Sequence, residues 1–426
     1  MFERPNSGGE NAILVSITFS SDIDQPPLNE FAELATSTGV KLVASITATR
    51  VTPDPKSFIG SGKLAEIEAM IAENEVDVVL FNHTLSPAQE RNLERILSCR
   101  VLDRTGVILD IFAQRARSFD GKLQVELAQL KHLSTRLIRG WTHLERQKGG
   151  IGLRGPGETQ LETDRRLIGG RIKAINKRLS KVTQQRELSR KARNRAQLPL
   201  ISVVGYTNAG KSTLFNSLTK ASVFAADQLF ATLDTTLRRM TLPNNSAIIL
   251  ADTVGFIQQL PHNLIAAFRA TLDETREADL LLHIVDASDA ERQLRIEQVN
   301  EVLTEIGAAE VPQIIVYNKI DKLDNCPARY ERDANGKINK VWLSAVTGAG
   351  IDFLTQALTE RQNNATCKIR VPVNAGDIRA LLYAEALVLD EKYADNGDSL
   401  IKVQISADLL NNINKRNIHG LESTGW

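Results

Sequence analysis

The segment LPLISVVGYTNAGKSTLFNSL, residues 198–218, limits the fold of this chain more than any other stretch. It starts with an apolar run that suits a buried strand, continues with Gly205-x-x-x-x-Gly210-Lys211-Ser212, and ends in an amphipathic helical pattern. A glycine-rich turn between a strand and a helix points backbone N–H groups at a bound phosphate, at the positive end of the helix. We therefore predict a P-loop, in which Lys211 bridges the β and γ phosphates and the Ser212 hydroxyl binds Mg²⁺.

A second segment, QIIVYNKID, indicates which base is bound. Its apolar run predicts a strand that ends at Asn318-Lys319-x-Asp321. The carboxylate of Asp321 can accept hydrogen bonds from both the ring N–H and the exocyclic amine of guanine, a pair that adenine does not offer. GTP is therefore the predicted substrate. Another predicted strand, VWLSAVTG, ends at Ser344 and Ala345, which are placed to close over the same base.

Two further segments lie where a nucleotide-dependent switch is expected. AIILADTVGF places Asp252 and Gly255 after a strand, where the carboxylate can reach Mg²⁺ through water and the Gly255 N–H can sense the γ-phosphate. LFATLDTTLRR holds Thr232, Thr235 and Thr236, and each has a hydroxyl that could complete the Mg²⁺ shell; we choose Thr232. The chain is thus predicted to be a Mg²⁺-dependent GTPase.

Gly255 is followed by Phe256, at the position where Ras carries the glutamine that orients the attacking water. Phenylalanine cannot orient a water molecule, and Gln258 and Gln259 are displaced along the chain, so we expect slow intrinsic hydrolysis. Two hypotheses remain open: a partner remodels the switch, or a monovalent cation such as K⁺ near Asn208 supplies positive charge. Within the chain itself, the catalytic roles are assigned to Lys211, Thr232 and Gly255.

Residues 12–110 alternate short apolar runs with helical patterns, which predicts a small parallel α/β domain. Ser86 followed by Pro87 supplies an N-cap and a first-turn proline, and Gln89 completes a capping box, so a helix is expected to begin there. The GSGK sequence at 60–63 lacks both the glycine spacing and the following Ser or Thr of a P-loop. We predict that it is a turn at the start of a helix.

The apolar period changes from Gly121 onward. Leucine recurs every seven residues from Leu123 to Leu144, and an apolar residue recurs in the same way from Leu161 to Val182. Two heptad-like segments of similar length can bury their apolar stripes against each other, which predicts an antiparallel helical hairpin. Each helix is expected to be about 35–40 Å long at 1.5 Å per residue.

A glycine-rich stretch, GGIGLRGPG at residues 149–157, joins the two predicted helices. It contains G-x-G-x-x-G, but it follows a helix instead of a strand, which argues against a dinucleotide-binding turn. One alternative is a flexible connection without function. We favour RNA binding, because glycines let backbone N–H groups approach a polyanion and residues 171–195 contain ten Lys or Arg and one acidic residue. The predicted RNA contacts are Lys148, Gly149, Gly150, Arg154, Gly155, Arg165 and Arg166.

Composition narrows the remaining classes of protein. With 42% hydrophobic and 24% charged residues, the chain is expected to be a soluble globular protein, and we expect a monomer. Cys99, Cys326 and Cys367 lack the spacing of a zinc site or a disulfide framework. No apolar run approaches the ~20 residues that span a bilayer, and the first residues lack the apolar core of a signal peptide. We therefore expect a cytoplasmic protein with no membrane partner.

These segments together closely resemble one family. GGIGLRGPGETQLETDRR, GYTNAGKS, FATLD, DTVGF, NKID and SAVTG stand in the order found in HflX, a family in the Obg-Era branch of translation-factor-type GTPases. The resemblance extends to about residue 365 and implies that Ser212 and Thr232 bind Mg²⁺. The GTP-binding residues that it implies are Gly205, Tyr206, Thr207, Asn208, Ala209, Gly210, Lys211, Ser212, Phe230, Ala231, Thr232, Leu233, Asp234, Asp252, Thr253, Val254, Gly255, Asn318, Lys319, Ile320, Asp321, Ser344, Ala345 and Val346.

The expected fold is α/β: an N-terminal parallel α/β domain with a long antiparallel helical hairpin, then a P-loop GTPase domain and a small C-terminal α/β appendage. The predicted boundaries are 1–120, 121–197, 198–365 and 366–426. The resemblance implies that the N-terminal domain and arm dock on the large ribosomal subunit and its rRNA, with the glycine-rich tip reaching toward the peptidyl-transferase region. Members of the family bind ribosomes and can split them, and some also hydrolyse ATP.

The expected function is therefore a GTPase, binding GTP and GDP, that couples nucleotide binding and hydrolysis to ribosome dissociation. Two alternatives remain open. One is a GTPase that assists assembly of the large subunit, and the other is a signalling GTPase with a protein target, for which the basic helix is a solvated surface. Salt dependence separates RNA from protein targets, because phosphate contacts weaken steeply with ionic strength.

Overall fold

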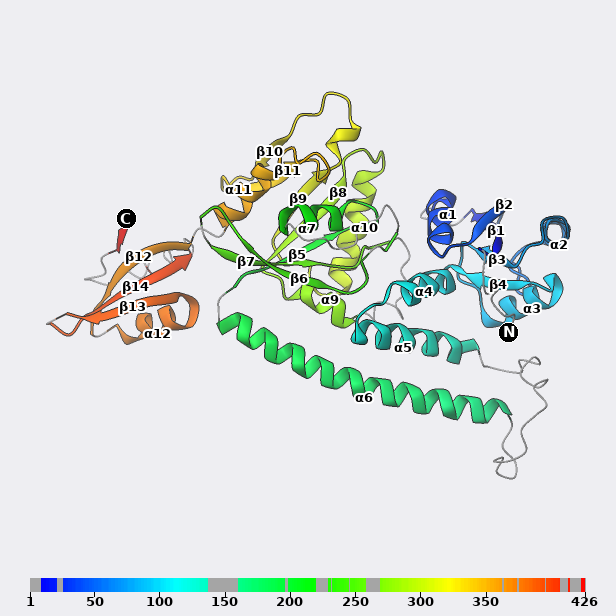
Figure 1. The fold of residues 1–426 in the computed structure, drawn as a ribbon, viewed down its shortest axis with the longest axis horizontal. Helices are drawn as coiled ribbons and strands as arrows, with labels where there is room; N and C mark the ends of the chain where they lie inside the picture. Colours follow the sequence, from blue (N-terminus) through cyan, green and yellow to red (C-terminus); the bar gives the residue numbers. More distant parts are fainter. Residues whose placement is uncertain are drawn as a thin grey trace.

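The computed structural model describes residues 9–20, 26–136, 160–195, 198–219, 229–257 apart from 231 and 245, 269–406 apart from 362, 363, 374 and 395, residue 413, and residues 423–425. Within these ranges the chain forms a mixed α/β structure in which the N-terminal domain and the C-terminal domain lie at opposite ends of a central domain (Figure 1).

The N-terminal domain is a parallel α/β unit, as the alternating apolar runs predicted. Its strands β1 (Asn11–Phe19), β2 (Lys41–Arg50), β3 (Val78–Phe81) and β4 (Arg100–Asp103) form a parallel sheet in the order β2-β1-β3-β4. The helices are α1 (Leu28–Ser37), α2 (Ser61–Asn74), α3 (Pro87–Leu97) and α4 (Arg104–Arg115). Side chains of β1 alternate between two buried clusters, with Ile13 on one face and Leu14 on the other, because successive residues of a strand point to opposite sides.

Two local predictions in this domain are confirmed. The α3 helix starts after Ser86, whose hydroxyl accepts from the Gln89 N–H, while the Gln89 side chain accepts from the Ser86 N–H. The GSGK sequence is the start of α2, with Gly60 in extended geometry as its N-cap.

The arm consists of α5 (Phe119–Arg136) and α6 (Gln160–Arg195), which run in opposite directions (Figure 1). They bury Leu123, Leu127 and Ile175 together, of which Leu123 and Ile175 belong to the two predicted heptad series, and Arg171 forms a bidentate pair with Glu126. The expected helix length was wrong for α6, which has 36 residues and is therefore about 54 Å long. The heptad series ends at Val182, whereas the helix continues to Arg195 through a stretch rich in lysine and arginine.

The central domain contains a seven-stranded sheet in the order β10-β11-β9-β8-β5-β7-β6. The outer strands β6 and β10 are antiparallel to their neighbours and the other pairings are parallel. The bounds of the strands are Leu200–Gly205 for β5, Thr236–Thr241 for β6, Ala247–Asp252 for β7, Leu280–Asp286 for β8, Gln313–Asn318 for β9, Arg329–Arg332 for β10 and Ile338–Trp342 for β11. The helices are α7 (Lys211–Thr219), α9 (Arg269–Arg276), α10 (Arg292–Glu305), the 3₁₀ turn η2 (Ile320–Lys322) and α11 (Ile351–Arg361).

The C-terminal domain is a four-stranded antiparallel sheet with one helix. Its strands β12 (Asn364–Val371), β13 (Leu387–Tyr393), β14 (Ser399–Ser406) and β15 (Ser423–Gly425) are ordered β13-β14-β12-β15. Helix α12 (Gly376–Glu385) buries Ile378 and Leu382 in the same cluster as Ile369 and Ile401. The small α/β appendage that was predicted is therefore present.

The N-terminal and central domains share one hydrophobic cluster. Residues of α4 and α5, among them Phe112 and Val125, pack with residues that follow the P-loop helix, among them Leu229, Phe230 and Leu233. The rings of Phe112 and Phe230 meet edge to face with their centroids 4.8 Å apart. The segment predicted as a switch is thus part of the joint between two domains.

Candidate nucleotide-binding site

The P-loop connects β5, a central strand, to α7, and its glycines are required by its geometry. Gly205 has φ +146°, and a Cβ there would stand 2.2 Å from the carbonyl oxygen of Ile284. Gly210 has φ +92°, and a Cβ there would stand 2.2 Å from Asn318 Nδ2. Only glycine adopts these angles in so little space, so both positions of the sequence pattern are explained by the backbone.

Lys211 is buried at the start of α7, and its Nζ donates to the carbonyl oxygen of Tyr206 at 2.6 Å. Burial lowers the pKa of the Lys211 ammonium to about 8, although the nearby Asp252 opposes this shift. A Cβ on Gly255 would stand 3.0 Å from Nζ, so the glycine keeps the space beside the ammonium open. An ammonium with few partners in a buried loop is suited to a phosphate.

Three oxygen-bearing side chains from different parts of the chain converge next to Lys211. Ser212 Oγ lies 2.7 Å from Thr232 Oγ1, and both hydroxyls donate to Asp252 Oδ2, at 2.8 and 2.9 Å. Asp252 is fully buried, burial raises its pKa, and its Oδ1 has no hydrogen-bond partner in the part of the chain that the structure describes. A set of hard oxygen donors with an unsatisfied carboxylate oxygen fits Mg²⁺. Among the three candidate threonines, Thr232 is the one found here.

The segment predicted to bind the base is organised around Asn318 and Ser344. Asn318 is buried, donates to the carbonyl oxygen of Ala209 at 2.9 Å and accepts from the Ala345 N–H at 2.9 Å, so it ties the base segment to the P-loop. Asp321 is exposed, and its carboxylate accepts from the Ser344 hydroxyl, which orients it at the surface. Ile320 is buried below it, and Val346 is exposed.

One ion pair of this region was not predicted. Lys319 has φ +65°, and its Nζ contacts Asp286 Oδ2 at 2.8 Å. Asp286 is the last residue of β8, the strand next to both β5 and β9. The signal that could have identified it is its place after the apolar run LLLHIV, because parallel strands end at the same edge of a sheet.

Several predicted GTP-binding residues have side chains that point elsewhere. Phe230, Leu233 and Val254 lie in the cluster shared with the N-terminal domain, and the Thr253 hydroxyl donates to the carbonyl oxygen of Val203 at 2.6 Å. The Asp234 carboxylate binds the turn before α5, accepting from the N–H groups of residues 117 and 118. For these residues only the backbone remains available to a nucleotide.

Phe256 is buried, and its backbone is paired with the P-loop. Its N–H donates to the carbonyl oxygen of Gly205 at 3.1 Å, and its own carbonyl accepts from the Thr207 N–H at 2.7 Å. Its ring lies in a hydrophobic cluster of the central domain, and a phenyl ring has no polar group that could orient a water. The Thr207 hydroxyl is buried without a hydrogen-bond partner among the described residues.

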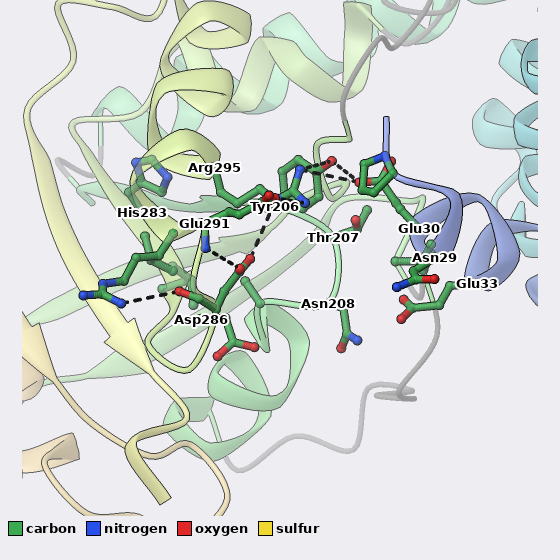
Figure 2. Close-up of a pocket in the computed structure, with 17 residues that line it drawn as sticks. Asn29, Glu30, Glu33, Tyr206, Thr207, Asn208, His283, Asp286, Glu291 and Arg295 are labelled. Atoms are coloured by element: carbon green, nitrogen blue, oxygen red, sulfur yellow. Dashed lines mark hydrogen bonds and ion pairs between the residues drawn. The ribbon is translucent and has the colours of Figure 1, made fainter. Parts of the chain in front are cut away.

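A cavity of about 490 Å³ lies beside the P-loop, between α1 and the end of β8. Figure 2 shows Tyr206 pointing from the P-loop to Glu30 of α1, next to Arg295 of α10, while Asn208 lines another part of the wall. The Tyr206 hydroxyl donates to Glu30 and accepts from Arg295 Nη1 at 3.2 Å. Arg104 Nη2 donates to the other oxygen of Glu30 at 2.6 Å. This contact between domains was also missed by sequence reasoning, since its partners are far apart in the chain.

Other predicted positions lie outside the described residues. These are Ala231, Gln258 and Gln259 near the switch, and Lys148, Gly149, Gly150, Arg154 and Gly155 at the arm tip. Arg165 and Arg166 are described, and both are exposed near the start of α6. No helix within the described ranges combines the length and the apolar character needed to cross a membrane.

Comparison with known proteins covers most of this arrangement. Three family models match: a GTP-binding GTPase N-terminal region at residues 25–113, a GTP-binding GTPase middle region at 115–193, and a 50S ribosome-binding GTPase at 200–319. A GTPase HflX from Escherichia coli is 56% identical over 95% of this chain and 95% of its own length. A GTPase HflX from Magnetococcus marinus is 46% identical over 89% of this chain and 88% of its own length. A crystal structure of a GTP-binding protein from Sulfolobus solfataricus in complex with GDP is 25% identical, with a TM-score of 0.43, and covers 82% of this chain and 98% of that one.

Proposed function

Because the chain belongs to the HflX family of GTPases, we propose that it binds the large ribosomal subunit in its GTP-bound state, separates the ribosome into subunits, and leaves after hydrolysis. The description of the matched model, a 50S ribosome-binding GTPase, supports the partner. The exposed Arg165, Arg166, Lys173 and Lys177 of α6 support the mode of contact, because cationic side chains bind RNA phosphates.

The proposed roles in GTP hydrolysis depend chiefly on one observation, the convergence of oxygen-bearing side chains next to Lys211. Water attacks the γ-phosphorus while the bond to the β-phosphate oxygen breaks, and negative charge spreads over the γ oxygens. The Lys211 ammonium and the Gly255 N–H stabilise that charge from fixed positions. Asp321 selects guanine by accepting two N–H bonds, and Asn318 holds the base segment against the P-loop.

Ser212 and Thr232 would hold Mg²⁺, with Asp252 acting through water, and the bound ion would supply positive charge to the β and γ phosphates. The hydroxyls reach this position through two different elements, α7 and the segment after it. Loss of the γ-phosphate removes a group that holds Thr232 in this position, so the segment that carries Thr232 is the switch.

Phe256 supplies no group that orients the attacking water, so hydrolysis depends on an additional factor. The ribosome is the proposed activator. A second proposal is that K⁺ binds beside Asn208, which lines a cavity with carboxylates of Glu33 and Asp286. Turnover in K⁺ is then faster than in Na⁺ at equal ionic strength, and the difference is reduced by Asn208→Ala. Equal rates in both salts rule out the K⁺ role and leave the ribosomal one.

The function is tested by measuring GTP turnover for the protein alone, with large subunits and with complete ribosomes, while light scattering follows subunit separation. Stimulation accompanied by separation is the expected result, and Lys211→Ala abolishes both. Stimulation by immature large subunits in preference to complete ribosomes would favour the assembly alternative. No stimulation by any ribosomal particle would refute the ribosomal proposal and point to a protein target.

The arm is tested by charge reversal. Lys173→Glu with Lys177→Glu should weaken ribosome binding and lower the slope of log affinity against log salt by about 0.7–1 for each phosphate that the arm no longer neutralises. Lys56→Glu with Lys402→Glu makes the same change of charge on exposed residues of other domains and serves as the control. Replacing residues 149–157 by a short polar turn should spare GTP binding and reduce ribosome-stimulated turnover. Unchanged stimulation in that variant would mean that the tip is a connection alone.

A further inference from the structure

Asp234 lies two residues after Thr232 but faces another domain. While Thr232 Oγ1 contacts Ser212 and Asp252, Asp234 Oδ2 accepts from the Arg117 N–H at 2.8 Å and the Ser118 N–H at 2.7 Å. Its Oδ1 accepts from the Ser118 hydroxyl at 2.6 Å. Both oxygens of one carboxylate are thus used by the turn that begins the arm.

This turn is the N-terminal end of α5. The Ser118 hydroxyl, besides donating to Asp234, accepts from the Gly121 N–H at 2.9 Å, which makes Ser118 the N-cap of the helix. A carboxylate beside the first turn also interacts favourably with the positive end of the helix. Asp234 therefore stabilises the start of α5 from outside the helix, and α5 in turn packs against α6.

Gly121 provides independent evidence that the start of α5 accommodates the Asp234 carboxylate. A Cβ at Gly121 would stand 1.9 Å from Asp234 Oδ1 and 2.9 Å from Ser118 Oγ. Gly121 is inside a helix and does not have the positive φ that favours glycine, so its backbone could be that of alanine. Glycine in a helix costs up to about 1 kcal/mol relative to alanine, and here it leaves room for the carboxylate.

The residues around Asp234 are packed against the same part of the N-terminal domain and arm. Phe230 and Leu233, on either side of Thr232, are buried against α4 and α5 in the cluster shared by the two domains. A segment anchored at Leu233 and Asp234 cannot shift Thr232 far without disturbing the start of the arm. The contacts at the metal-binding oxygens and those at the arm are separated by a single residue.

We propose that Asp234 is a positioning residue that joins the placement of Thr232 at the phosphates to the placement of α5 at the root of the arm. When Thr232 occupies the position seen here, Asp234 caps the turn before α5 and sets the direction of the arm. When the segment leaves the phosphates, the cap is removed and the first turn of α5 loosens. By linkage, a ligand that holds the arm changes nucleotide affinity by the same factor by which nucleotide changes arm binding. The ribosomal part of this consequence rests on the proposed function.

The first test uses the isolated full-length protein and hydrogen exchange of residues 117–121, with Mg²⁺-GDP and with a non-hydrolysable GTP analogue. Exchange in the native protein should differ at least about fivefold between the two nucleotides. In Asp234→Ala it should be at least about tenfold faster than in the native GTP-analogue state and the same with both nucleotides. Equal exchange in both nucleotide states of the native protein, or a difference that persists in Asp234→Ala, would overturn the proposal.

Two further variants separate positioning from general loss of stability. Gly121→Ala should speed exchange of the same amides, whereas the higher helix propensity of alanine alone would slow it. Ser118→Ala removes one of the three hydrogen bonds to Asp234 together with the bond from the Gly121 N–H to the Ser118 hydroxyl, and it gives a usable variant if Asp234→Ala does not fold. Asp54 accepts from the Lys56 and Ser57 N–H groups and the Ser57 hydroxyl, the same three kinds of donor, within its own loop. Asp54→Ala should leave exchange at 117–121 unchanged.

The second test compares the affinity of large subunits for the protein with GDP and with the GTP analogue. The ratio of the two affinities should fall at least about fivefold in Asp234→Ala. If the native protein shows no nucleotide-dependent ribosome binding, the proposed function fails while the exchange experiment still decides the role of Asp234. If the ratio is unchanged in the variant, Asp234 does not couple the two sites.

Discussion

Removal of one hydroxyl from the P-loop should weaken the joint between the N-terminal and central domains. The Tyr206 hydroxyl donates to Glu30, a carboxylate that is 8% exposed, and accepts from Arg295 Nη1. Tyr206→Phe keeps the ring, which lies 4.5 Å from the Arg295 guanidinium, and deletes the hydrogen bonds alone. The change therefore isolates the polar part of this contact.

The size of the effect follows from the partners that Glu30 retains. A hydrogen bond to a charged group contributes ~1.5–3 kcal/mol, and more when the group left behind has no partner. In the variant, Arg104 still binds Glu30 Oε1 at 2.6 Å, and Arg295 remains 3.7 Å from Oε2. Because the carboxylate keeps one close partner, we expect the free energy of unfolding of the shared core to fall by about 2 kcal/mol.

Urea unfolding of the native protein and the variant measures this difference. Tyr383→Phe is a matched control, since the Tyr383 hydroxyl also donates to a glutamate, Glu391, but this tyrosine is 51% exposed in the C-terminal domain. The control should leave stability unchanged within error, because water replaces the missing hydroxyl. A change in Tyr206→Phe below about 0.5 kcal/mol, or one equal to the control, would refute the reasoning that burial makes this bond important.

Three further outcomes are expected. Asp321→Asn should weaken GTP binding about 10–100-fold and improve binding of xanthosine triphosphate, as measured by nucleotide competition; retained preference for GTP would contradict the assignment of the base. Burial raises the pKa of the Cys99 thiol to about 11, so at pH 8 roughly one thiol in a thousand is ionised, and peptide mapping should find the partly exposed Cys326 alkylated before Cys99. Burial also raises the pKa of Glu90 to about 7 from 4.5, so between these pH values the native state holds a proton that the unfolded chain releases. The free energy of unfolding should therefore fall as pH rises from about 4.5 to 7, and Glu90→Gln should flatten that dependence in thermal denaturation. Equal pH profiles for the native protein and the variant would reject this prediction.

The parts of the fold that sequence reasoning predicted correctly are those with local causes. The helix after Ser86 follows from a capping box within four residues, and the parallel sheet of the N-terminal domain follows from alternating apolar runs. The length of α6 was underestimated because the sequence after Val182 is rich in lysine and arginine and has no apolar period to mark where the helix ends.

In the candidate site, too, the features with local causes were predicted and those that depend on tertiary contacts were not. The glycines at 205 and 210 and the choice of Thr232 agree with the geometry of the P-loop and its neighbours. The directions of Phe230 and Asp234 could not be predicted, because FATLD has no pattern that separates a side chain facing a nucleotide from one facing another domain. That choice depends on which surface lies beside the segment after folding.

The sequence by itself predicted the chemistry of this protein, because the patterns expected for phosphate binding, base selection and helix starts each lie within a few consecutive residues. The tertiary structure decided how that chemistry is connected to the rest of the chain. Glu30 meets Tyr206 across 176 positions, and Asp234 meets Ser118 across 116. Such contacts arise where two folded surfaces are complementary in shape and charge, a property that neither segment carries alone.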